Sequence, residues 1–394
     1  MRFFKRDISG QLKEFSKFPV VGILGPRQSG KTTLAKHYFK NHTFVNLEDL
    51  ELRAFAKEDP KKFLSNYENK NGLIIDEFQY VPSLLSYIQI EVDEKRRPGY
   101  FVLTGSQNFL MNQAITQSLA GRIGILTLLP LSINEMEKNK LLSDVDSTIV
   151  QGSYPRLYLE SIIPSSFYPS YIQTYIERDV RQITNVTDLL VFQKFMKLCA
   201  ARTGQLLNLS EIAMQCGISN KVATNWISVL TSSYIVFLLR PHFTNFNKRI
   251  VKAPKLYFYD TGLASSLLEL RSEKDIAFSQ FRGHLFENLI ISDFYKQYFN
   301  IAIEPPLYFW RDQNDRVEVD CIISTHNQLI PVEIKSGHTA TSDFFEPLKN
   351  WSKISGVDPS LGYIVYAGDL SQDRAYGKLI SWKKAGNLIQ KIEE

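Results

Sequence analysis

Cysteine is scarce in this sequence, and long apolar runs are missing from it. The three cysteines, Cys199, Cys216 and Cys321, are far apart and show no Cys-x-x-Cys spacing. This pattern indicates neither a disulfide framework nor a zinc site, so we expect a reducing, cytoplasmic environment. Apolar runs such as 123–131 and 234–239 are far shorter than the roughly 20 residues that span a bilayer. The N-terminus also lacks the apolar centre of a signal peptide, and we expect no membrane association.

A strong excess of one charge is missing too. The chain has 46 Lys and Arg against 41 Asp and Glu, which gives a formal net charge of +5. This mild basicity permits nucleic-acid binding but does not require it, because an ordinary protein surface can carry the same balance. The length of 394 residues predicts two or three domains.

The first third of the chain alternates short apolar runs with amphipathic stretches. The apolar runs predict five strands: Val20–Leu24, Phe44–Leu47, Leu73–Ile75, Phe101–Leu103 and Ile123–Leu129. The segments between them are long enough for crossover helices. The alternation therefore predicts an α/β domain with a parallel sheet that helices cover on both faces.

A glycine-rich segment, GPRQSGKT, follows the first predicted strand and has the spacing Gly-x4-Gly-Lys-Thr. Its glycines allow the backbone to wrap a phosphate, to which amide groups and a helix N-terminus offer positive partial charge. Lys31 is expected to reach the β- and γ-phosphates, and the Thr32 hydroxyl to face Mg²⁺. The pattern predicts an ATP site formed by Gly25, Pro26, Arg27, Gln28, Ser29, Gly30, Lys31, Thr32 and Thr33.

Two carboxylates, Asp76 and Glu77, follow the third predicted strand. Open α/β sheets bind ligands at the carboxyl ends of their strands, which would bring both acids near the phosphate loop. We expect Asp76 to hold Mg²⁺, largely through water, and Glu77 to orient and polarise the attacking water. A glutamate at this position favours ATP hydrolysis over passive binding.

Polar residues also end the strand that begins at Phe101. Thr104, Ser106 or Gln107 could sense the γ-phosphate, and the sequence does not choose among them. Arg122 directly precedes the fifth predicted strand. It is a candidate to stabilise transition-state charge, in the same subunit or in a neighbouring one, and the alternative is a surface arginine at a helix end.

A second set of charged residues lies near the C-terminus. If the strands around the turn at His326–Asn327 pair as a hairpin, Asp320 falls opposite Glu333, and Lys335 shares the strand face of Glu333. These three catalytic candidates match the Asp…Glu-x-Lys arrangement of metal-dependent nucleases. Asp320, Glu333 and Glu287, from a preceding helix, would be the ligands of Mg²⁺ or Mn²⁺. The alternative is an ion-pair ladder across a hairpin, although the surrounding Val and Ile favour a site.

The middle of the chain predicts a helix-turn-helix within residues 205–260. Lys221, Thr224 and Asn225 are expected on the outer face of its second helix. One lysine and no arginine on that helix favour a scaffold role over strong DNA readout.

Basic residues gather directly after this helix pair. Five Lys or Arg and no acid lie from Arg240 to Lys255. They could contact phosphates, belong to a solvated loop, or pair with acidic residues elsewhere in the chain.

The order of these motifs resembles that of the prokaryotic AAA+ ATPases that carry a C-terminal domain of unknown function. The resemblance covers nearly the whole chain through the segments GPRQSGKTTLA, LIIDEFQYVP, VLTGSQNFLM, SLAGRIG, GSYPR, YIERDV, KLYFYDTGLA, GHLFENLI, EVDCII and PVEIKSG. It implies that Arg122 is an arginine finger or sensor and that Asp320, Glu333 and Lys335 form a nuclease-like site. Val319 stands where such sites often have the proline before the aspartate.

The resemblance implies an α/β fold class with four segments. They are a P-loop AAA+-type core at 1–137, a helical linker or lid at 138–204, a winged helix-turn-helix at 205–260 and a restriction-endonuclease-like domain at 261–394.

The leading hypothesis is an enzyme in which Mg²⁺-dependent ATP hydrolysis switches a nuclease-like domain that cuts or holds nucleic acid, with DNA favoured. One alternative is a signalling or scaffold ATPase that binds protein partners, and another is a nucleic-acid-binding module without cleavage. An arginine that acts in a neighbouring subunit would require a homo-oligomer.

Overall fold

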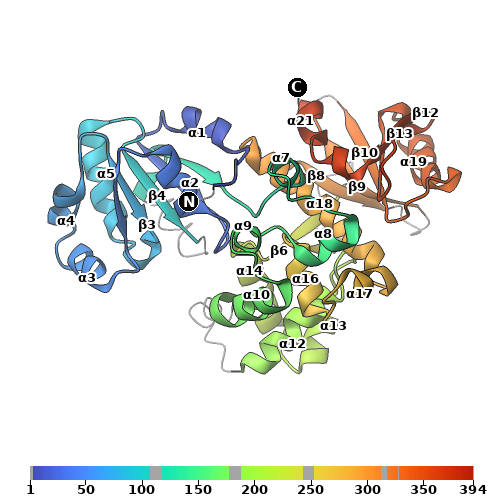
Figure 1. The fold of residues 1–394 in the computed structure, drawn as a ribbon, viewed down its shortest axis with the longest axis horizontal. Coiled ribbons are helices and arrows are strands. Elements are labelled where there is room, and N and C mark those ends of the chain that lie inside the picture. The colour runs from blue at the N-terminus through green and yellow to red at the C-terminus, as the bar shows by residue number, and fades with distance from the viewer. Residues whose placement is uncertain are drawn as a thin grey trace. The chain divides into compact units, whose positions relative to one another are not determined.

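The computed structural model describes residues 3–106, 118–176, 188–242, 253–311, 317–326 and 328–393 (Figure 1). Contacts divide the chain into two compact units. The first consists of Met1–Pro130 with Ser232–Tyr234 and Phe299–Ile303, and the second of Leu131–Thr231, Ile235–Tyr298 and Glu304–Glu394. In the described ranges, no helix is both long and apolar enough to cross a membrane.

The first unit is an α/β layer structure. Its helices and strands include α1 (Ser9–Phe15), β1 (Val20–Leu24), α2 (Lys31–Tyr38), β2 (Thr43–Asn46), α3 (Leu50–Glu58), α4 (Pro60–Tyr67), β3 (Leu73–Asp76), α5 (Leu84–Lys95), β4 (Phe101–Gly105) and β5 (Ile123–Thr127). The five strands pair in parallel in the order β2-β3-β4-β1-β5. The five predicted strands and the parallel sheet are confirmed.

Alternate residues of these strands face opposite sides of the sheet. Val20 and Leu24 of β1 pack in one apolar cluster with α4 and α5, whereas Val21 and Ile23 pack in another with α1 and α2 (Figure 1). Both faces of the sheet are therefore buried under helices, which explains why the strands are continuous apolar runs. The polar residues that follow the strands are left at the carboxyl edge.

The second unit combines helices with a mixed sheet. Its helices include α7 (Ile133–Lys138), α8 (Val145–Gln151), α9 (Pro155–Leu159), α10 (Pro164–Tyr171), α12 (Leu189–Ala200), α13 (Leu209–Cys216), α14 (Asn220–Ser232), α16 (Thr261–Leu267), α17 (Glu273–Phe278), α18 (Arg282–Asn300), α19 (Glu346–Ser355), α20 (Trp382–Ala385) and α21 (Leu388–Glu393). Its strands include β6 (Val236–Pro241), β7 (Lys255–Phe258), β8 (Leu307–Arg311), β9 (Glu318–Ser324), β10 (Leu329–Lys335), β11 (Tyr363–Tyr366), β12 (Gln372–Arg374) and β13 (Gly377–Ser381).

The strand order in this unit is β12-β13-β11-β10-β9-β8-β6-β7. Strand β6 pairs antiparallel with β7 and also parallel with β8, so the hairpin after the helix-turn-helix is the end of the large sheet. Residue 260, the predicted end of the winged-helix segment, thus does not separate two bodies in this structure. The physical reason is the ladder between Arg240–Pro241 and Tyr308–Phe309, which the sequence did not indicate.

Candidate nucleotide site and C-terminal charged cluster

The phosphate loop connects the carboxyl end of β1 to the first turn of α2. Gly25 has a φ of 148°, and a Cβ there would overlap the carbonyl oxygen of Leu128. Gly30 has a φ of 96° and directly precedes α2, which begins at Lys31. Only glycine adopts these conformations at low cost, so the spacing of the two glycines fixes the path of the loop.

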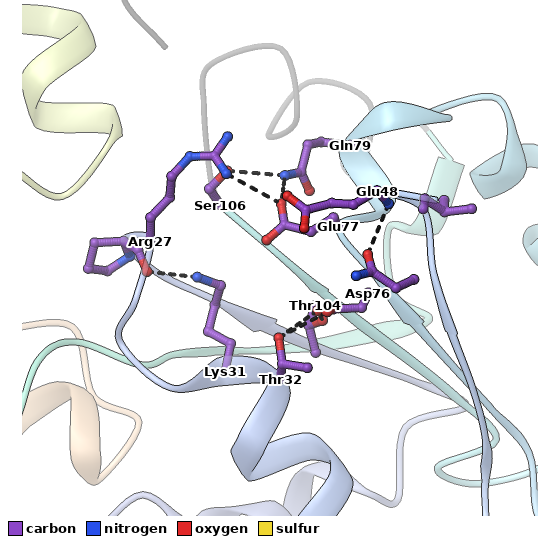
Figure 2. A network of polar contacts seen from close by, with 12 residues as sticks. Arg27, Lys31, Thr32, Glu48, Asp76, Glu77, Gln79, Thr104 and Ser106 are labelled. Carbon is purple, nitrogen blue, oxygen red and sulfur yellow. Dashed lines mark hydrogen bonds and ion pairs between the residues drawn. The ribbon is translucent and has the colours of Figure 1, made fainter. Parts of the chain in front are cut away.

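A magnesium-type ligand set lies directly beside this loop (Figure 2). The Thr32 hydroxyl lies 2.9 and 3.0 Å from the two carboxylate oxygens of Asp76, and Thr104 also hydrogen-bonds to Asp76. Lys31 is buried, and its Nζ donates to the carbonyl of Pro26 at 2.7 Å. The structure therefore brings Lys31, Thr32 and Asp76 together at one sheet edge, as the motif spacing predicted.

Glu77 lies next to this set in a left-handed backbone conformation, with a φ of 53°. Its carboxylate accepts a hydrogen bond from the Gln79 amide and lies 4.0 Å from Arg27 Nη1 (Figure 2). Burial raises the pKa of Glu77 above its usual value, although the charges of Lys31 and Arg27 oppose the shift. A carboxylate with a raised pKa is a stronger proton acceptor, which suits the role predicted for Glu77.

The residues present at this site fit a nucleotide with Mg²⁺. Magnesium is commonly held by a hydroxyl, one or two carboxylates, water and substrate phosphates, and Thr32 and Asp76 supply the protein part. In the loop itself, Gln28 Oε1 and Ser29 Oγ are buried without a hydrogen-bond partner among the residues that the structure describes. Buried polar atoms are rarely left unpaired, so these atoms are consistent with a ligand that would meet them.

One residue of this site carried no signal in the sequence. Arg6 precedes α1 and is 5% exposed, and its guanidinium donates to the carbonyl of Ser29 at 2.8 Å and to that of Leu129 at 2.6 Å. It ties the phosphate loop to the segment that follows β5. Arg6 lies 23 residues before Ser29 and has no fixed spacing to the motif, so no pattern could have identified it.

The candidate sensors differ in what they contact. Thr104 hydrogen-bonds to Asp76, whereas Ser106 Oγ lies 3.1 Å from Gln79 Nε2, on the side of Glu77. Gln107 lies outside the described residues. Ser106 is thus connected to the predicted water-activating group and Thr104 to the predicted magnesium ligand.

Arg122 lies at the opposite edge of the sheet. It directly precedes β5, and its carbonyl accepts from the Val20 amide at the amino end of β1, whereas the phosphate loop follows the carboxyl end of β1. Its guanidinium pairs with Asp93 at 2.6 and 2.9 Å. A role for Arg122 at the nucleotide of its own subunit is therefore wrong, because a full strand length separates the two. A role in a neighbouring subunit stays a prediction.

The predicted hairpin pairing near the C-terminus is present. Strands β9 and β10 are antiparallel with Cys321 opposite Val332, and this register places Asp320 opposite Glu333. Asp320 Oδ2 accepts from the Ile334 amide at 2.9 Å, and Lys335 Nζ lies 2.6 Å from Glu333 Oε1. Asn327, in the predicted turn, lies outside the described residues.

Both carboxylates of this pair are strongly perturbed. Burial raises the pKa of Asp320 and of Glu333, and nearby carboxylates add to the shift, chiefly Glu287 for Asp320 and Asp320 for Glu333. Glu333 is 4% exposed and the Asp320 side chain 15%, so the two carboxylates do not form a solvated ion-pair ladder.

The three carboxylates predicted as metal ligands do not share an open centre. Lys255 Nζ is 3.1 Å from Glu287 Oε1 and 3.9 Å from Asp320 Oδ1, and it is 2.5 Å from Glu318 Oε1. Over the described ranges, no group of three or more His, Cys, Asp or Glu side chains is arranged to hold a metal ion. The prediction of a metal centre at Glu287, Asp320 and Glu333 is thus wrong for this structure, because a buried ammonium group lies among the acids.

The helix-turn-helix presents the outer face that the sequence predicted. Lys221, Thr224 and Asn225 are exposed on α14, whereas Trp226 is buried. Gly217 ends α13 in the left-handed conformation that the turn requires. Among the basic residues expected between Arg240 and Lys255, those from 248 to 252 lie outside the described residues.

Comparisons with known families match three consecutive parts of the chain. An AAA domain matches residues 17–137. Two domains of unknown function, DUF8612 and DUF4143, match residues 142–274 and 282–385. The AAA match coincides with the sheet and the phosphate loop, so the first third of the chain is a P-loop domain similar to AAA ATPases.

Curated relatives carry no assigned function. The uncharacterized proteins Rv2008c of Mycobacterium tuberculosis and Mb2031c of Mycobacterium bovis are each 29% identical over 340 residues, which are 85% of this chain and 74% of theirs.

Solved structures include more distant similarities. The Walker-type ATPase PABY2304 of Pyrococcus abyssi is 16% identical with a TM-score of 0.46, and covers 67% of this chain and 96% of its own. The RuvB Holliday junction branch migration motor of Thermotoga maritima is 17% identical with a TM-score of 0.30, and covers 58% and 86%. Both TM-scores lie below 0.5, so the ATPase assignment rests on the AAA match and on the phosphate-loop geometry.

Replacing Arg6 should loosen the phosphate loop. In Arg6→Met the two carbonyls lose charge-assisted hydrogen bonds worth about 1.5–3 kcal/mol each, and ATP affinity should fall about tenfold or more. Arg6→Lys should recover only part of the affinity, because one ammonium cannot reproduce the planar fork. Calorimetric titration with ATP measures this, and Lys5→Met is the neighbouring control; equal affinity in Arg6→Met and wild type would contradict the role.

Proposed function

We propose that the chain is a Mg²⁺-dependent ATPase whose hydrolysis site is completed by a second copy of the chain and whose second unit binds nucleic acid, with DNA favoured, without cutting it. The observation that carries the ATPase part is the group formed by Lys31, Thr32, Asp76 and Glu77 at one sheet edge. No other cluster in the described residues joins a phosphate loop to acids in this way.

Each side chain of the nucleotide site has a distinct task in this proposal. Thr32 and Asp76 would hold Mg²⁺, which neutralises phosphate charge when bound. Lys31 exchanges its bond to the Pro26 carbonyl for phosphate oxygens. Glu77 orients the attacking water and takes its proton, and Arg27 and Gln79 hold the Glu77 carboxylate in place.

Arg122 would complete the site of a neighbouring copy. It is partly exposed, its exposed partner Asp93 can be exchanged for another anion at little cost, and it lies on the edge opposite to its own phosphate loop. An arginine placed in this way can stabilise transition-state charge only across a subunit interface. The proposal therefore includes a homo-oligomer.

The outer face of helix α14 is the candidate nucleic-acid-binding surface of the second unit. Lys221, Thr224 and Asn225 project from α14 into solvent, and hydroxyl, amide and ammonium groups are the usual contacts to phosphates and bases. The mild positive net charge is compatible with this partner. The absence of cutting follows from Lys255, which lies among the carboxylates that cleavage would need for metal.

A protein partner is the second candidate, and exposed apolar side chains favour it. Met214 on α13 is 75% exposed and Leu190 on α12 is 76% exposed. Large exposed apolar side chains on neighbouring helices suit a protein surface better than a phosphate backbone. Salt dependence separates the two candidates, since only nucleic-acid binding weakens steeply with salt.

Removal of the phosphate-loop lysine should abolish ATPase activity. We expect Lys31→Ala to lose ATP binding and Glu77→Gln to retain ATP binding but hydrolyse it about 10²–10³-fold more slowly, as is typical when an electrostatic or proton-transfer group is removed. Phosphate release and ATP titration measure the two effects. Lys40→Ala, an exposed lysine after α2, should match wild type; normal turnover in Glu77→Gln would contradict the role of Glu77.

Arg122 can be tested by mixing inactive copies. Arg122→Ala and Lys31→Ala should each be inactive, but an equimolar mixture should recover about a quarter of wild-type activity, because half the copies keep Lys31 and half their neighbours keep Arg122. A mixture of Arg122→Ala with the double variant, which carries both Lys31→Ala and Arg122→Ala, should recover no ATPase activity, because no copy in it keeps Arg122. If Arg122→Ala alone stays fully active, Arg122 has no role in hydrolysis.

Duplex binding should depend on α14. Lys221→Ala should weaken binding of a labelled DNA duplex and lower the slope of log affinity against log salt by about one. Lys274→Ala on α17, also exposed, is the control. Fluorescence anisotropy at several salt concentrations measures this, and binding that is absent even at low salt would favour the protein partner.

A further inference from the structure

Lys255 is the most completely enclosed cation of the second unit's charged cluster. It begins β7, its side chain is 5% exposed, and its ammonium group pairs with carboxylates from two different elements, Glu287 on α18 and Glu318 on β9. Burial opposes the charged form of Lys255, but the charges of Glu287, Asp320 and Glu318 outweigh this effect and raise its pKa. The surrounding carboxylates therefore favour the charged form of Lys255.

One oxygen of the helix carboxylate in this cluster has two donors. Glu287 Oε1 accepts from Lys255 at 3.1 Å and from the Tyr257 hydroxyl at 2.5 Å. Both donors come from β7, so this strand supplies the cation and the hydroxyl that Glu287 Oε1 contacts. In a metal site the same oxygen would have to face the ion instead.

One carboxylate oxygen of the pair formed by Asp320 and Glu333 nevertheless has no partner. Glu333 is 4% exposed, and its Oε2 has no hydrogen-bond partner among the residues that the structure describes. Buried carboxylate oxygens usually have partners. The pair therefore keeps one carboxylate oxygen that a further ligand could meet.

We propose that Lys255 is a built-in counter-cation which takes the electrostatic place of a divalent metal, so that the native cluster binds no Mn²⁺ or Mg²⁺ and becomes a divalent-cation site when Lys255 is made neutral. The inference deepens the proposed non-cutting role of the second unit and rests on it. A divalent ion bound to Asp320 would lie within a few ångströms of the buried ammonium, and two unscreened cations at that distance repel strongly. Native metal binding would thus require Lys255 to leave three carboxylate partners.

The experiment is a Mn²⁺ titration of the full chain without nucleotide, with free Mn²⁺ followed by electron paramagnetic resonance. Lys255→Met removes the charge and keeps the length of the side chain. It should bind one additional Mn²⁺ per chain, at least about tenfold more tightly than any site of the wild type, since four carboxylates then face fewer cations. Asp320→Asn in the same background should abolish this binding. Lys383→Met, an exposed lysine paired with Asp369, should titrate like wild type.

The wild-type chain tests the idea independently if Lys255→Met does not fold. Wild type and Asp320→Asn should then give the same Mn²⁺ titration. Weaker Mn²⁺ uptake by Asp320→Asn than by wild type would overturn the proposal, as would a folded Lys255→Met that gains no site.

The result of the Mn²⁺ titration can be distinguished from the results that test the proposed ATPase activity and nucleic-acid binding. ATP turnover and duplex binding report on the first unit and on α14, and their failure would leave the Mn²⁺ titration unchanged. Plasmid cutting by wild type with Mn²⁺ that disappears in Asp320→Asn would contradict the non-cutting role directly.

Discussion

The nucleotide site depends on one constraint, the parallel pairing of β1, β3 and β4. Because β4 pairs with both neighbours in parallel, the carboxyl ends of all three strands meet at one edge of the sheet. The register sets Asp76 beside Thr104, and Thr32 reaches the same carboxylate from the start of α2. A shift of one residue in β3 would turn Asp76 to the other face and would leave the phosphate loop without a metal ligand.

The nucleotide site and the cluster around Lys255 differ in what their charged groups contact. Among the described residues, the nucleotide site leaves polar atoms such as Ser29 Oγ unpaired, and Lys31 Nζ donates to the neutral carbonyl of Pro26, a contact that a charged ligand can displace. In the cluster around Lys255, the ammonium group pairs with Glu287 and Glu318 and lies 3.9 Å from Asp320. Breaking a buried ion pair is strongly unfavourable because it leaves an unpaired charge, so this cluster resists exchange of its cation. The first arrangement is suited to turnover and the second to a fixed structure.

The sequence predicted those parts that local geometry determines. Glycine spacing fixes the phosphate loop, a strand end presents Asp76, and a hairpin turn sets Asp320 opposite Glu333, all within a few residues of the motif concerned. It could not predict contacts that long-range packing creates. Arg6 reaches the carbonyl of Leu129 across 123 positions, and no fixed spacing describes such a pair.

Lys255 shows the same limit in chemical terms. In the sequence it was one of five basic residues in a stretch that allowed phosphate contacts, a solvated loop or acidic partners. The pairing of β6 with both β7 and β8 places Lys255 among the acidic residues of the cluster. Of the three alternatives, Lys255 therefore follows the last one, pairing with acidic residues elsewhere in the chain. A motif of acids specifies which carboxylates meet, but the element that packs against them specifies what neutralises them. The same Asp…Glu-x-Lys hairpin can therefore be a metal site or a filled ion-pair cluster, and a single buried ammonium group from another strand makes the difference.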